Sequence, residues 1–127
     1  MVSGILLYWA EGAKFTKAPS IEFTNTDSQM IRLMMKFFRE ILNVSENKFA
    51  LTARIYEGGD LKKAEKYWLS VTGISKNSLK RPEILQLSKD SKSLKKYPYG
   101  MCRIGVYNIL AYRKLIALIE EFSKKIK

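Results

Sequence analysis

The residue whose position most favours chemistry is a carboxylate at the end of an apolar segment. Residues 2–11 are mostly apolar and predict a short helix buried on more than one side, with Gly12 as its C-terminal stop. Glu11 then lies where the helix dipole is already negative, so it needs a cation nearby. Lys14 or Lys17 can supply that cation, and taken alone the residues favour this ordinary ion pair. If two copies of the helix pack together, however, two carboxylates meet and can bind a divalent metal ion.

Histidine is absent from the chain. A histidine-based metal site, a Ser-His-Asp triad and a Cys-His pair are therefore excluded, and catalysis must use carboxylates, lysines, hydroxyls or a metal ion held by oxygen ligands. The single cysteine, Cys102, cannot form an internal disulfide, which favours a reducing, cytoplasmic location. The longest apolar run, residues 5–10, is too short to cross a bilayer, and no charged leader with a cleavage site precedes it. We therefore expect neither a membrane span nor a signal peptide.

The charge balance predicts a polyanionic partner. Twenty-three Lys and Arg residues against 12 Asp and Glu residues give a net charge of +11 and a pI near 9.8. A uniformly lysine-rich surface would need no such partner, because some proteomes are generally rich in lysine. The surplus is clustered instead: residues 76–96 hold only Glu83 and Asp90 as acids against seven basic residues, namely Lys76, Lys80, Arg81, Lys89, Lys92, Lys95 and Lys96.

The 127 residues predict a single α/β domain spanning positions 1–127. Alternation of apolar and polar residues predicts strands over 20–26, 49–57, 84–90 and 101–107. Helical periodicity predicts a long helix capped by Thr26 or Asp27, a helix between Asp60 and Gly73, and a final helix over 109–126. We expect a curved, mainly antiparallel four-stranded sheet with helices packed on one face.

A sheet covered by helices on one face presents its other face to water or to a partner. The outward positions of the predicted strands carry groups that hydrogen-bond to base edges and phosphates, although any half-buried sheet has polar outward residues. The basic loop after the third strand would reach the nucleic-acid backbone and make binding salt-dependent. The predicted nucleic-acid contacts are Thr24, Thr52, Arg54, Gln86, Ser88, Lys89, Lys92, Lys95, Lys96 and Arg103, and Glu22, Tyr56 and Tyr107 are expected on the same face.

Residues 4–12 (GILLYWAEG) resemble a degenerate LAGLIDADG motif, an apolar helix that ends in an acid and a glycine. Further segments, in order along nearly the whole chain, are similar to a prokaryotic group of LAGLIDADG-like proteins. These segments are 8–14 (YWAEGAK), 23–27 (FTNTD), 30–33 (MIRL), 67–68 (YW), 71–74 (VTGI), 99–104 (YGMCRI) and 106–107 (VY).

The resemblance implies a homing-endonuclease-like fold with a saddle-shaped sheet that binds double-stranded DNA, and paired motif helices at the axis of a homodimer. It places Gly4, Leu7 and Tyr8 in that dimer interface. Glu11 would help hold Mg²⁺ near the scissile phosphates, so that the metal ion activates water, and Lys14 is the nearest basic residue that could assist.

The sequence departs from the family pattern at three points. The acid is glutamate instead of the usual aspartate, only one motif is present, and the helix-turn-helix region of many relatives is not found. A single motif requires a homodimer for cleavage. Two alternatives stay open: a non-catalytic, regulatory DNA-binding domain with the same fold, and a basic structural or protein-interaction domain unrelated to DNA.

Overall fold

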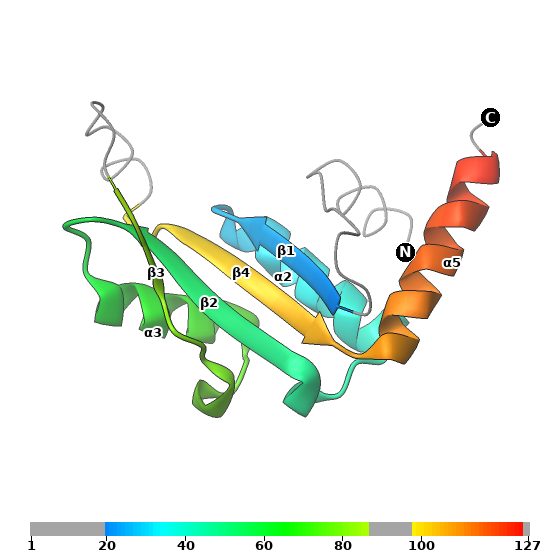
Figure 1. Ribbon diagram of the computed structural model, residues 1–127, viewed down its shortest axis with the longest axis horizontal. Coiled ribbons are helices and arrows are strands. Elements are labelled where there is room, and N and C mark those ends of the chain that lie inside the picture. The colour runs from blue at the N-terminus through cyan, green and yellow to red at the C-terminus, as the bar shows by residue number, and fades with distance from the viewer. Residues whose placement is uncertain (1–19, 87–97, 126–127) are drawn as a thin grey trace.

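The computed structural model describes residues 20–86 and 98–125, which form an α+β arrangement of a four-stranded mixed sheet and three α-helices (Figure 1). The predicted order of strands and helices is confirmed for these residues. The elements are β1 (Ser20–Asn25), α2 (Ser28–Lys36), which continues as the π-helical turn η1 (Phe37–Ile41), the 3-10 turn η2 (Glu46–Lys48), β2 (Phe49–Tyr56), α3 (Leu61–Thr72), the 3-10 turn η3 (Lys76–Ser78), β3 (Glu83–Leu85), β4 (Met101–Tyr107) and α5 (Ile109–Lys125).

The sheet has the strand order β1-β4-β2-β3. Strand β4 pairs antiparallel with both β1 and β2, whereas β3 pairs parallel with β2. A parallel pair needs a crossover connection, and α3 supplies it between β2 and β3. The sheet is therefore mixed, with antiparallel pairing at its centre and the parallel pair at one edge.

Period-two alternation along the central strands builds the core. In β2, Leu51, Ala53 and Ile55 are buried, and in β4, Ile104 and Val106 are fully buried, as the sequence predicts. These side chains join one apolar cluster with buried residues of α2 and α3, which lie on the same side of the sheet (Figure 1). The opposite side of the sheet carries the polar positions of the same strands. We call that side the open face.

Local signals set the helix ends where the sequence predicts them. The Asp27 carboxylate accepts a hydrogen bond from the Gln29 amide at 2.8 Å, and the Asp60 carboxylate accepts one from the Lys63 amide at 3.1 Å. Gly73 ends α3 in the left-handed conformation, with φ at 71°. Helix α5 starts directly after β4, and it buries Ala111 and Leu115. Among the described helices, none is both long and apolar enough to cross a membrane.

The third strand departs from its predicted range of 84–90. Strand β3 comprises only Glu83–Leu85, and the part of the predicted range from 87 onward lies outside the described residues. The register places Glu83 opposite Arg54 and Leu85 opposite Tyr56, so these two residues of β3 share the open face. Gln86, expected on that face, follows the end of the strand and is exposed. The sequence therefore predicted the wrong residues of β3 for the open face. A three-residue edge strand alternates too briefly to show which of its residues point to which face.

The turn before β4 is held against α3 and β2. Trp68 of α3 donates its indole N–H to the Tyr99 carbonyl at 2.9 Å, and the Tyr99 ring stacks on Tyr67 with centroids 4.0 Å apart. Gly100 follows with φ at 65°, and a Cβ atom at this position would lie 2.1 Å from the Arg54 carbonyl oxygen. The turn therefore requires a residue without a side chain.

Replacing Gly100 with Ala is expected to lower the free energy of unfolding by about 3 kcal/mol or more, because left-handed strain adds to overlap with the β2 backbone. Gly73→Ala is the matched control, since Gly73 has a similar φ of 71° but its nearest contact for a Cβ is the flexible Arg39 side chain at 3.5 Å. Gly73→Ala should lower the free energy of unfolding only by the left-handed backbone strain, about 1–2 kcal/mol. Urea denaturation of both variants measures the difference, and equal losses would contradict the close approach at Gly100.

Candidate nucleic-acid interface

The open face is organised in rows that run across the strands. Thr24 of β1, Arg103 of β4 and Thr52 of β2 form one row, because Arg103 pairs with both threonines. Arg54 of β2 lies opposite Glu83 of β3 in the neighbouring row. Of the predicted nucleic-acid contacts, the structure thus brings together two arginines and two threonines at the middle of one face.

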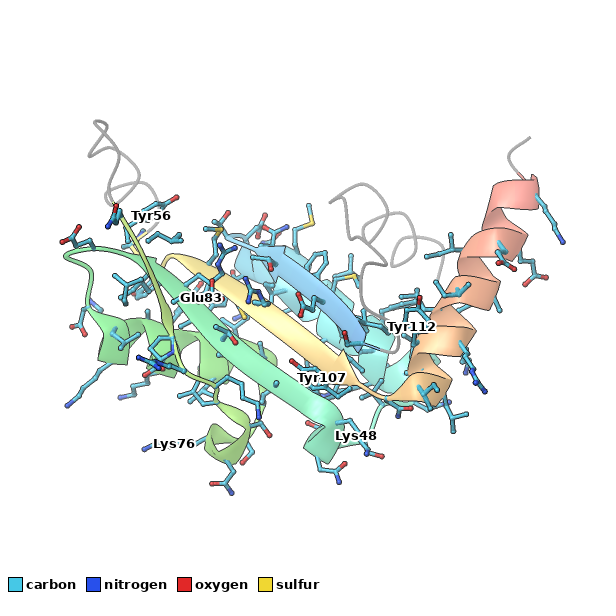
Figure 2. The ribbon with its side chains drawn as sticks, in the orientation of Figure 1. Lys48, Tyr56, Lys76, Glu83, Tyr107 and Tyr112 are labelled. Atoms are coloured by element: carbon cyan, nitrogen blue, oxygen red, sulfur yellow. The ribbon has the colours of Figure 1, made fainter. Side chains whose placement is uncertain are left out.

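An Arg54–Glu83–Arg103 ion network lies at the centre of this face. Arg54 donates its Nε–H to Glu83 Oε2 at 2.8 Å. Arg103 donates from Nη1 to Oε1 at 2.7 Å and from Nη2 to Oε2 at 3.3 Å, so both carboxylate oxygens accept hydrogen bonds. The three residues come from β2, β3 and β4, and Figure 2 labels Glu83 beside the strands. The two guanidinium groups are thereby held at a common acceptor.

Glu83 is the residue of this site that sequence reasoning missed. In the sequence it is only one of two acids in a basic segment, with no local partner. The parallel register of β3 against β2 places it opposite Arg54, and that pairing depends on the crossover through α3. A carboxylate immediately before the predicted strand over 84–90 was the only signal available, and it does not identify which basic residues it meets.

The network is partly open to solvent and electrostatically coupled. The side chains of Arg54, Arg103 and Glu83 keep 26%, 28% and 40% of their exposure. Partial burial works to raise the pKa of Glu83, but the hydrogen bond and charge of Arg103, together with Arg54, outweigh it and lower the pKa. The carboxylate is therefore ionised at neutral pH and neutralises one of the two arginine charges. The other guanidinium N–H groups of Arg54 and Arg103 make no hydrogen bond to the side chain of another described residue and can donate to an acceptor.

The described open face carries no charge surplus of its own. Arg54 and Arg103 are matched in number by Glu83 and by Glu22, which is exposed on β1 and makes no ion pair with any described residue. The Tyr107 hydroxyl oxygen lies 3.2 Å from the position that a Cβ atom of Gly105 would take on the same face, and Figure 2 labels Tyr107. What the face offers is directed hydrogen bonding, and the strong basic charge must come from other parts of the chain.

Several predicted site residues lie outside the part of the chain that the structure describes. They include the proposed catalytic and metal-binding residues and the predicted dimer contacts, so the geometry leaves these roles as predictions. Within residues 20–86 and 98–125, no group of three or more acidic or cysteine side chains that could hold a metal ion is found. The residues outside are Gly4, Leu7, Tyr8, Glu11, Lys14, Ser88, Lys89, Lys92, Lys95 and Lys96.

Comparison with known proteins adds no assignment. No protein-family model matches the chain, and a search of curated proteins finds none that is significantly similar.

Glu83→Gln is expected to reduce the free energy of unfolding by about 1 kcal/mol at neutral pH. A single exposed ion pair contributes little, but this substitution removes the ion pairs of Glu83 with both Arg54 and Arg103. Because the folded-state pKa of Glu83 is lowered from 4.5, the contribution is present above 4.5 and is lost as the pH falls through the folded value. Urea denaturation from neutral pH down to about pH 3 should show the wild-type advantage shrinking toward zero.

Glu22→Gln is the matched control, because it removes a carboxylate from the same face without removing an ion pair to a described residue. It should leave the free energy of unfolding at neutral pH unchanged. An advantage of wild type over Glu83→Gln that persists undiminished at acid pH would show that the carboxylate charge is not the source of the stabilisation.

Proposed function

We propose that this chain is a double-stranded DNA-binding domain that contacts its target through the open face. The observation that carries the proposal is the pair of guanidinium groups of Arg54 and Arg103, held together by Glu83 in the middle of a sheet surface. Arginine forks donate in pairs to guanine edges and to phosphates. A net charge of +11 supplies the general attraction to a polyanion.

The neighbouring side chains suit the same partner. Thr24 and Thr52 flank Arg103 on the adjacent strands, and their hydroxyl groups can both donate and accept hydrogen bonds at base edges or phosphates. The basic loop that contains Lys89 and Lys92 is proposed to contact the DNA backbone beside this face. Base contacts by the sheet would thus give sequence preference, and phosphate contacts by the loop would give affinity.

Glu83 has a defined role in this proposal. Its two oxygens occupy the guanidinium positions that a phosphate or a guanine edge would use, so the bound partner competes with an internal carboxylate. The competition lowers affinity for DNA in general and favours a sequence that satisfies the oriented donors well. Glu83 therefore reduces non-specific binding, while it keeps the two arginines aligned.

Alanine substitution of Arg103 or Arg54 is expected to weaken binding to a selected DNA duplex roughly tenfold to a hundredfold, because each removes oriented donors. Glu83→Gln should strengthen binding to random duplexes, because it leaves both arginine charges uncompensated. A labelled duplex selected from a random library provides the probe, and Kd is measured by fluorescence anisotropy over a range of salt concentrations.

Arg32→Ala is the control for lost charge, since Arg32 is exposed on α2, the helix that packs on the opposite face. It should change Kd little. Equal weakening by Arg32→Ala and Arg103→Ala would mean that binding follows net charge alone, and the proposed interface would be abandoned. Absence of duplex binding by the wild-type chain at physiological salt would instead favour the structural or protein-interaction alternative.

The resemblance of residues 4–12 to the LAGLIDADG motif supports a further proposal, that the chain acts as a homodimer which cleaves the bound DNA. Gly4, Leu7 and Tyr8 would form the dimer interface. Glu11 from each protomer would hold Mg²⁺, and the metal ion would activate water and stabilise the leaving oxygen. Lys14 would assist near the scissile phosphate.

Glu11→Gln is expected to abolish cleavage of a randomised supercoiled DNA library in Mg²⁺ while leaving duplex affinity close to wild type, because it removes the metal ligand without altering the open face. Sequencing the cut ends would also give the target site. Cleavage by Glu11→Gln at the full rate would exclude this role for Glu11. Binding without cleavage by either protein would favour the non-catalytic, regulatory alternative.

A further inference from the structure

A groove lies along the outer side of α3, on a part of the molecule separate from the open face. It has a volume of about 510 Å³ and runs between α3 and the segment that follows the helix. Figure 2 labels Lys76 beside η3, on the side of the sheet where α3 lies. The groove is lined by Lys62, Glu65, Lys66, Leu69, Lys76 and Leu79.

Two walls of the groove are held in place by ordinary secondary structure. Lys62, Lys66 and Leu69 follow one another at helical spacing, so they share one face of α3. The opposite wall is fixed to the sheet, because the Lys80 amide donates to the Leu51 carbonyl at 2.8 Å and Leu79 forms a bridge to Leu51. The groove is therefore present without any bound partner.

The rim of the groove is cationic. Lys62, Lys66 and Lys76 are exposed, and none of the three forms an ion pair with a carboxylate among the described residues. Of the described residues that line the groove, Glu65 is the single acid, which leaves a surplus of positive charge there. Lys80 and Arg81, which follow Leu79 in the sequence, are also basic and exposed.

The floor of the groove is apolar. Leu69 and Leu79 are partly buried, and both pack against the hydrophobic core while still lining the groove. Apolar surface of this kind is stabilised by covering it with another apolar group, whereas a nucleic-acid backbone presents charged phosphates and no aliphatic side chain. An aliphatic side chain flanked by carboxylates satisfies the floor and the rim together.

We propose that this groove binds an acidic peptide segment of a partner protein. An aliphatic side chain of the segment inserts between Leu69 and Leu79, and its acidic side chains pair with Lys62, Lys66 and Lys76. The match is one of charge and of apolar contact, the combination that gives a small interface both orientation and affinity. The site does not depend on DNA binding, because it lies beside α3 and uses none of the residues of the open face.

The test is selection of binding peptides from a random peptide display library on the intact wild-type chain. Peptides that combine acidic and aliphatic residues are expected to be enriched. A double charge reversal, Lys62→Glu with Lys66→Glu, should weaken the selected peptide by about tenfold or more, since it removes two attractions and adds two repulsions. Replacing the aliphatic residue of the peptide with Ser should also weaken binding, and this change leaves the protein untouched.

Lys36→Glu with Lys48→Glu is the matched control, because both lysines are exposed on other elements and the net charge changes equally. Thermal unfolding followed by circular dichroism checks that both double variants fold. Equal loss of peptide binding in the two variants, or enrichment of peptides without acidic residues, would refute the proposed groove partner. Loss of duplex DNA binding in Lys62→Glu with Lys66→Glu, but not in the control, would assign the groove to nucleic acid instead.

Discussion

Burial of one face of the central strands is the constraint on which the rest of the structure depends. Strand β4 lies between β1 and β2, and its buried residues Cys102, Ile104 and Val106 pack into the common core. Side chains alternate along a strand, so a slip of one residue would expose Ile104 and bury Arg103. The free energy of burying this face therefore keeps Arg103, and with it the ion network, on the open side of the sheet.

The Arg54–Glu83–Arg103 network adds little to the stability of the fold, but it orients the two arginine side chains. Partly exposed ion pairs are weakened by solvent, so the network is a poor source of folding free energy. Three hydrogen bonds from two guanidinium groups to one carboxylate nevertheless restrict the rotamers of both arginines. An interface that starts with aligned donors loses less side-chain entropy when a partner binds.

The oriented hydrogen-bond donors and the surplus of positive charge lie on different surfaces of the described molecule. The described open face has as many acids as arginines, whereas α3 and the segment after it carry lysines that form no ion pair with a described residue, over an apolar floor. A net charge of +11 therefore does not by itself identify which surface meets a partner. The two surfaces lie on different sides of the sheet, so the two proposed partners would not compete for one site.

Local patterns in the sequence were sufficient for most of the elements. Asp27, Asp60 and Gly73 act as helix boundaries through hydrogen bonds and backbone conformations that involve only their near neighbours. Alternation along β2 and β4 likewise predicted which side each residue takes, including Arg54 and Arg103. Strand β3 was misjudged because its position depends on pairing with β2 and not on its own short pattern.

By itself, the sequence determined most of the described elements, the buried faces of the central strands and the basic character of the chain, because each follows from residue type and near spacing. Only the tertiary structure decided that Glu83 joins Arg54 and Arg103, and that Lys76 and Leu79 face Lys62 and Leu69 across a groove. Those contacts depend on strand order and on the parallel crossover through α3. Pairing between distant segments is settled by the packing of the whole core, which no local pattern encodes.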